Sequence, residues 1–107
     1  MRAESVGALK MSNPTKKEKE YWGKICKIGC IVCLKNGIYS PYVSVHHING
    51  RTKRGAHMNV LPLCFSHHMG GTKENPSIHP WKARFIRLHG TQESLKTMVD
   101  NLLDGIA

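Results

Sequence analysis

The stretch VSVHHINGRTKRGAHMNVLPLCFSHH, residues 43–68, decides the fold of this chain. Apolar and polar side chains alternate along its first part, which predicts a strand over Ile38–Ile48. An Asn-Gly pair then indicates a turn and opens the basic loop Asn49–Asn59. The apolar residues Val60–Leu63 predict a second strand, and FSHHMGG after Cys64 predicts a short helix or turn. This spacing predicts a small ββα unit.

The flanks of this unit predict helices, so we expect an α+β fold and a single domain over residues 14–107. Apolar residues recur near helical spacing on both sides of the unit, and glycines stand where two of the helices can end. The predicted flanking elements are a helix over Pro14–Ile28, a tight turn at Cys30–Leu34, a helix over Trp81–His89 and a last helix capped by Thr91. Residues 1–13 lack apolar periodicity and are expected to form a flexible leader.

The charge of the chain indicates a polyanionic partner. Its 107 residues hold 16 Lys and Arg against 7 Asp and Glu, which gives a formal net charge of +9. Nucleic acid is the commonest partner of so basic a chain, and we expect DNA. No apolar run is long enough to span a bilayer, so we expect no membrane partner. The sequence does not predict an oligomeric state.

Four cysteines in so small a chain indicate either disulfides or a metal site. Because no secretory signal precedes them, we expect a cytoplasmic protein, in which reduced thiols are available to bind metal. Cys30-x-x-Cys33 and Cys64-x-x-His67 offer three thiolates and one imidazole, the donors of a tetrahedral structural zinc site. The alternative is that these are buried free cysteines, which is our interpretation of Cys26.

A second group of histidines follows from the adjacent pair His46-His47 and from His68, which comes directly after the zinc-ligand candidate His67. Neighbouring residues of a strand point to opposite sides, so one histidine of the pair can bind a metal while the other acts on water. Neutral imidazole suits both tasks, because it ligates metals and accepts protons near pH 7. The alternative is that these histidines are structural.

The order of these motifs resembles the zinc-ribbon branch of the HNH (ββα-metal) endonuclease superfamily. The motifs are Cys30-x-x-Cys33, His46-His47-Ile48, Asn59-Val-Leu-Pro-Leu-Cys64 and His67-His68. Within that superfamily the chain is most similar to the phage Ref family of recombination-enhancement, RecA-dependent nucleases. The resemblance implies a zinc-ribbon knuckle beside a catalytic ββα-metal core. It also implies hydrolysis of DNA coated by a RecA filament, in the cytoplasm of the phage's host.

The resemblance assigns roles to four residues. It implies that His47 is the general base and that Asn59 steadies the loop between the strands. It further implies that His46 and His68 hold a catalytic divalent metal, which is Mg²⁺, Mn²⁺ or Zn²⁺. Two imidazoles leave positions open for water and a phosphate oxygen, as a catalytic ion requires.

The sequence departs from the family pattern at Thr72, where many relatives carry another histidine. His79 lies beyond an insertion-like stretch and is either a third ligand of the catalytic metal or an ordinary residue at the start of a helix. We interpret His57 and His89 as structural or solvent-facing, although His57 lies near enough to Asn59 to touch DNA.

Two groups of cations are candidates for contact with DNA phosphates, and the alternative for each is a solvated surface. They are Arg51, Lys53 and Arg54 in the loop, and Lys82, Arg84 and Arg87 on the later helix. Two other function classes compete with the nuclease. One is a noncatalytic zinc-ribbon module that binds DNA or a protein, and the other is a small toxin-like RNase that uses histidine acid and base chemistry without the second metal.

Overall fold

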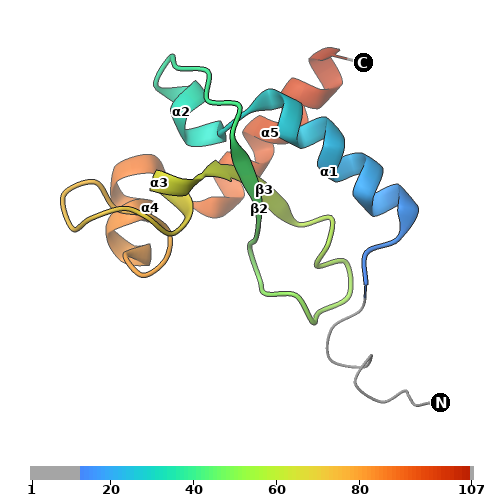
Figure 1. The fold of residues 1–107 in the computed structure, drawn as a ribbon, viewed down its shortest axis with the longest axis horizontal. Coiled ribbons are helices and arrows are strands. Elements are labelled where there is room, and N and C mark those ends of the chain that lie inside the picture. The colour runs from blue at the N-terminus through green and yellow to red at the C-terminus, as the bar shows by residue number, and fades with distance from the viewer. Residues whose placement is uncertain (1–12, 107) are drawn as a thin grey trace.

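The computed structural model describes residues 13–106 and places a small two-stranded sheet among five helices (Figure 1). The strands β2 (Val43–His47) and β3 (Val60–Cys64) pair antiparallel, with Val43 opposite Cys64 and His47 opposite Val60. The short helix α3 (Phe65–His68) follows β3 directly. The α+β class and the two strands followed by a short helix are therefore confirmed. The predicted leader lies outside the described residues, except for Asn13.

The first strand is shorter than the sequence predicted. Its pairing begins at Val43 because the partner strand ends at Cys64, after which the chain turns into α3. The residues from Ile38 to Tyr42 therefore have no strand opposite them. The prediction of a tight turn at Cys30–Leu34 was wrong, since α2 (Ile31–Lys35) forms a helix there that begins with a hydrogen bond of 2.9 Å from Leu34 N–H to Cys30 O.

Helix α1 (Lys16–Ile28) begins at a capping box and ends at a glycine. Thr15 Oγ1 accepts from the Glu18 amide at 3.1 Å, and the Thr15 amide donates back to the Glu18 carboxylate at 2.7 Å. Gly29 ends the helix with φ 83°, and a Cβ at this position would lie 2.8 Å from Ser40 O. Both features require glycine at this turn.

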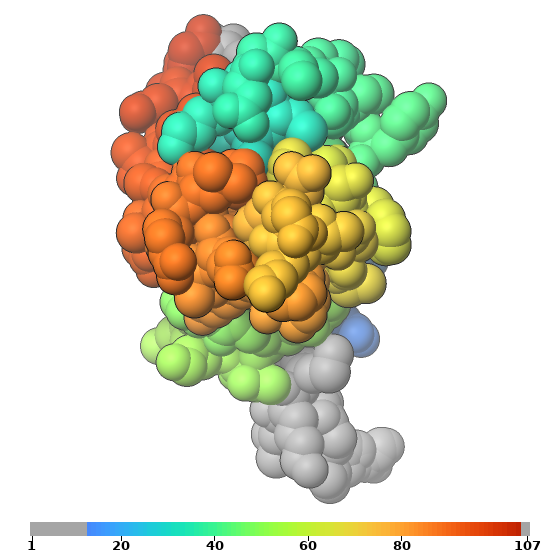
Figure 2. Space-filling view, turned by 90° about the vertical axis from the view of Figure 1, so that its left-hand side faces the viewer, coloured from blue at the N-terminus to red at the C-terminus, as the bar shows by residue number. Residues whose placement is uncertain are grey.

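Helices α4 (Lys82–His89) and α5 (Gln92–Ile106) complete the core. As predicted, Thr91 caps α5, with its Oγ1 accepting from the Ser94 amide at 3.1 Å. The largest fully buried side chains come from α1, α2, β3, α4, α5 and the segment before α4, and they include Ile25, Ile31, Leu61, Phe85 and Leu95. Figure 2 shows α4 and the segment before it covering one face, between α2 and the loop that joins the strands. Among residues 13–106, none of the helices has the length and apolarity needed to cross a membrane.

Candidate active site

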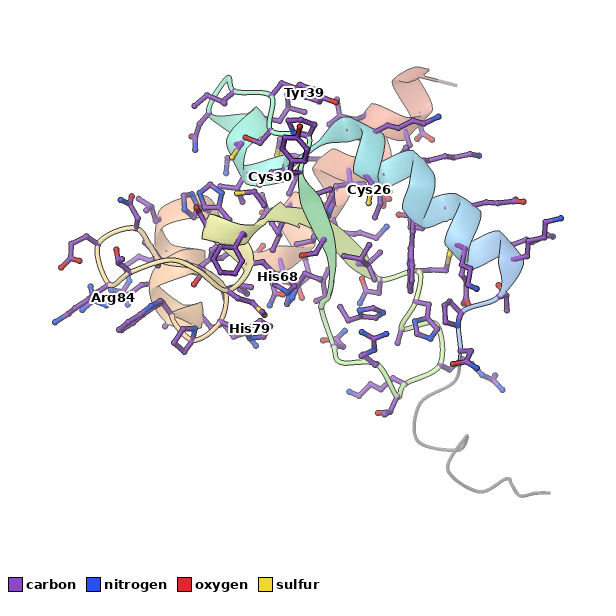
Figure 3. The ribbon with its side chains drawn as sticks, in the orientation of Figure 1. Cys26, Cys30, Tyr39, His68, His79 and Arg84 are labelled. Carbon is purple, nitrogen blue, oxygen red and sulfur yellow. The ribbon has the colours of Figure 1, made fainter. Side chains whose placement is uncertain are left out.

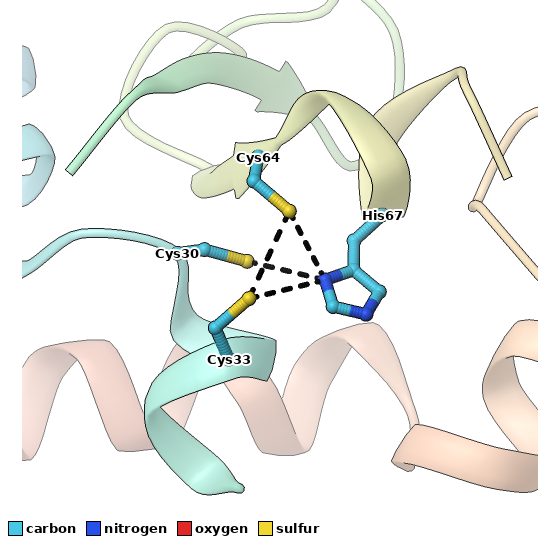
Figure 4. A group of neighbouring side chains, drawn as sticks. All are labelled: Cys30, Cys33, Cys64 and His67. Carbon is cyan, nitrogen blue, oxygen red and sulfur yellow. Dashed lines mark hydrogen bonds between the residues drawn. The ribbon is translucent and has the colours of Figure 1, made fainter. Parts of the chain in front are cut away.

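The two knuckle motifs converge, and their four metal-binding atoms all lie within 4.8 Å of one another (Figure 4). Cys30 and Cys33 come from the start of α2, Cys64 ends β3, and His67 lies on α3. The sulfurs of Cys33 and Cys64 are 3.8 Å apart, and His67 Nδ1 lies 3.2 to 3.5 Å from the three sulfurs. Zinc–sulfur bonds of about 2.3 Å in a tetrahedron put two sulfurs about 3.8 Å apart, so the donor set fits zinc.

The burial of this Cys and His group explains why its thiolates need a bound cation. Cys30 is fully buried, and its burial raises the pKa of the thiol to about 12. Burial also lowers the pKa of His67, which favours the neutral imidazole that ligates metals. Three thiolates at such short distances repel one another unless a cation lies between them. Four convergent soft and borderline donors can therefore hold a structural metal such as zinc.

A second group of donors lies beside the knuckle. The ring nitrogens that His46, His68 and His79 offer to a metal also lie within 4.8 Å of one another. His46 is on β2, His68 is on α3, and His79 precedes α4 (Figure 3). The amide of His79 donates to His68 O at 3.1 Å, so the segment before α4 folds back along α3. This backbone contact brings the His79 ring beside those of His46 and His68, so His79 can serve as a third metal-binding residue.

Two polar side chains decide which nitrogen of each histidine faces the centre of this group. Gln92 Oε1 lies 2.7 Å from His46 Nε2, and Ser44 Oγ lies 2.6 Å from His68 Nδ1. These hydrogen bonds leave Nδ1 of His46 and Nε2 of His68 for an ion. Burial, before any other cause, lowers the pKa of His46 to about 4, so its ring is neutral at pH 7. Gln92, which is buried at the first position of α5, is not among the residues predicted from the sequence.

Replacing Gln92 by Leu is expected to weaken binding of a divalent ion to the histidine group by about 10- to 100-fold. The leucine removes the oxygen that holds His46 Nε2 and lets the ring turn. Titration calorimetry of the zinc-loaded protein with Mn²⁺ measures this affinity. Gln92→Glu is the matched control, because it keeps an oxygen in place. Equal Mn²⁺ affinity of Gln92→Leu and the parent would show that Gln92 does not orient the ligand.

His47 lines a cleft of about 310 Å³ together with all three histidines of this group. Burial lowers the pKa of His47, and the positive charge of Arg51 lowers it further. The ring is therefore neutral near pH 7 and can accept a proton. A neutral base beside a metal-binding group in one cleft can activate water for hydrolysis.

Of the two alternatives for His57, structural or solvent-facing, the structure supports the structural one. His57 is only 6% exposed, and its Nδ1 lies 3.0 Å from His47 Nε2. Asn59, which is half-buried, closes the loop through its backbone, because its carbonyl accepts from the Ile48 amide at 3.0 Å. His89 is half-buried, with its ring against Phe85.

The six cations predicted to contact DNA do not all lie together. Arg51 and Lys82 line the cleft with His47, which places a positive charge on two of its walls. Lys53 and Arg54 are exposed on the loop between the strands. Arg84 and Arg87 instead line a separate hollow with Lys73, on the outer side of α4.

One family of known proteins matches nearly the whole described chain. The family model described as "Recombination enhancement, RecA-dependent nuclease" matches residues 14–104. The matched residues include both groups of metal-binding side chains, His47, and the loop that carries His57 and Asn59.

Proposed function

The chain belongs to the recombination-enhancement, RecA-dependent nuclease family, and we propose on this premise that it is an HNH-type, metal-dependent DNA endonuclease. The observation that supports the proposal most is that His47 shares one cleft with the metal-binding group of His46, His68 and His79. Phosphodiester hydrolysis needs a base that activates water and a positive charge at the leaving oxygen. This cleft can supply both.

The three histidines are proposed to hold the catalytic divalent ion. Their nitrogen donors suit Zn²⁺ or Mn²⁺, whereas Mg²⁺ prefers oxygen ligands. When bound, such an ion stabilises the negative charge that develops on the phosphate and the leaving oxygen. Three protein ligands leave coordination positions open for water and a phosphate oxygen.

The proposed base is His47. As the water oxygen attacks phosphorus, its O–H bond breaks and the proton passes to the unprotonated nitrogen of His47. The bond between phosphorus and the leaving oxygen then breaks, and that oxygen takes the electron pair. Asn59 is proposed to support this geometry by closing the loop behind His47, and Cys30, Cys33, Cys64 and His67 are proposed to hold a structural zinc ion that fixes α3.

DNA is the proposed substrate, coated by a RecA filament, and the cytoplasm of the host is the proposed place of the reaction. Arg51 and Lys82, which line the cleft, are proposed to meet phosphates there. Lys53, Arg54, Arg84 and Arg87 are proposed to hold the strand further away. Contacts of this kind give affinity without reading the base sequence.

Replacing both Arg84 and Arg87 by Ala is expected to weaken DNA binding at all sequences alike. Each phosphate contact that is lost lowers the slope of log K against log salt by about 0.9, so the double variant should lose about 1.8. Fluorescence anisotropy of labelled duplex DNA across a salt series measures the slope. Lys96→Ala is the control, because Lys96 pairs with Asp100 at 2.6 Å. An unchanged slope would remove Arg84 and Arg87 from the DNA interface.

The test of the proposed function is a cleavage assay with the zinc-loaded protein. Circular single-stranded DNA and supercoiled duplex are incubated with Mg²⁺ or Mn²⁺, with and without a RecA filament and ATP. Cleavage that requires the added ion supports the endonuclease, and cleavage confined to the filament lanes supports RecA-coated DNA as substrate. Binding of DNA without cleavage in any lane would favour the noncatalytic zinc-ribbon module. Cleavage of RNA without the added ion would favour the RNase.

A further inference from the structure

We propose that His57 is a positioning residue that fixes the orientation of His47 and the nitrogen on which His47 carries its proton. The inference rests on the proposed function, because it assigns a partner to the base of that reaction. His47 Nε2 and His57 Nδ1 are 3.0 Å apart, a hydrogen-bonding distance. The two rings stand nearly perpendicular, at 81°, with their centroids 5.2 Å apart.

His57 is itself held firmly in place by helix α1. The indole Nε1 of Trp22 donates to the carbonyl oxygen of His57 at 2.6 Å. The Trp22 ring also packs edge-on against both imidazoles, with centroids 5.5 Å from His57 and 5.7 Å from His47. Just before the second strand, the Asn59 amide lies 3.2 Å from the carbonyls of Gly55 and Ala56, which closes a turn around His57. A residue fixed on so many sides can orient its neighbour.

His47 and His57 line different hollows. His47 lines the cleft that contains the metal-binding histidines, whereas His57 lines a separate hollow beside Glu18 and Arg54. His57 therefore acts through His47 and does not touch the reacting atoms. Orienting a base through its second nitrogen is the task that a carboxylate performs in hydrolytic triads.

The hydrogen bond decides which nitrogen of His47 receives the proton. Its Nε2 is engaged with His57, so Nδ1 is the nitrogen available to water. For Nδ1 to accept a proton, Nε2 must already carry one and donate it to the lone pair of His57 Nδ1. His57 then carries its own proton on Nε2. The same hydrogen bond persists, with the same donor, after His47 Nδ1 has taken the proton of water.

Three substitutions of His57 distinguish the loss of its hydrogen-bond acceptor from a change in side-chain size. Asn places its side-chain oxygen close to the position of the imidazole Nδ1, Gln places its oxygen further out, and Phe fills the space without an acceptor. With DNA and the divalent ion, His57→Phe and His57→Gln are expected to lower kcat by about 10- to 100-fold, with KM little changed. His57→Asn is expected to recover most of kcat. Zinc content and thermal unfolding check that each variant is folded.

Nitrogen NMR of the imidazole rings gives a readout that does not depend on cleavage. In the zinc-loaded parent and in His57→Asn, His47 is expected to carry its proton on Nε2 and to have an unprotonated Nδ1. In His57→Phe the proton is expected to divide between the two nitrogens. A folded His57→Phe protein with the parental tautomer and kcat would overturn the inference, as would a parental His47 protonated on Nδ1. If the parent has the expected tautomer but cleaves no DNA, the proposed function fails while the positioning stands.

Discussion

A His47→Ala variant is expected to cleave DNA about 100- to 10,000-fold more slowly than the parent, the range that loss of a general base produces. The variant keeps His46, His68 and His79, whose donors lie within 4.8 Å of one another. It should therefore still bind the divalent ion but no longer take the proton from water. Single-turnover rates with saturating protein measure the chemical step apart from DNA affinity.

Two controls make this result interpretable. Mn²⁺ titration of His47→Ala should give the parental affinity, because none of the three proposed ligands has changed. Thr97→Ala should cleave within a few-fold of the parent, since Thr97 is exposed on α5 and does not line the cleft. A parental cleavage rate in metal-loaded His47→Ala would remove His47 from the chemistry and require another base.

Replacing Cys64 by Ser is expected to unfold the chain at room temperature. Cys64 Sγ lies 3.2 Å from His67 Nδ1 and 3.8 Å from Cys33 Sγ, so its loss breaks the proposed zinc site. Structural zinc contributes about 10 kcal/mol or more to folding in zinc-finger peptides. Domains of this size are stable by only about 5 to 15 kcal/mol in total. Circular dichroism and zinc analysis of the purified variant measure both consequences, and chelation of the parent should give the same unfolded spectrum.

Cys26→Ser is the matched control for this prediction. Cys26 is half-buried on α1 and packs against the core, and its thiol belongs to neither metal-binding group of residues 13–106. The variant should keep one zinc ion and lose no more stability than a small core substitution costs, about 1 to 2 kcal/mol. If Cys64→Ser unfolded cooperatively at the melting temperature of the parent, the knuckle would not be needed for the fold.

The knuckle and the ββα unit could be predicted because their signals are local in the chain. Cys30 and Cys33 are three positions apart, as are Cys64 and His67, and each pair needs only one turn of backbone to converge. The alternation from Val43 to His47 shows the strand in the same way. Residues that are close in the chain stay close in space however the rest of the fold packs.

The partners of these residues could not be predicted, because they depend on how distant elements pack. Gln92 reaches His46 across 46 positions, and only the docking of α5 brings them within 2.7 Å. His57 meets His47 because the loop folds back beneath Trp22, and the loop's composition indicated exposure. The sequence allows two roles for His79, a third metal ligand or an ordinary residue at the start of a helix, because its place depends on a backbone contact with α3.

His67 and His68 are consecutive residues of one short helix, and each belongs to a different metal-binding group. This adjacency bears on the order in which the two metal-binding groups form. If the proposed zinc ion is what fixes α3, His68 is not held beside His46 and His79 until the knuckle has bound its ion, and the second site is expected to form after the first. The proposed nuclease would then be inactive until it has taken up zinc.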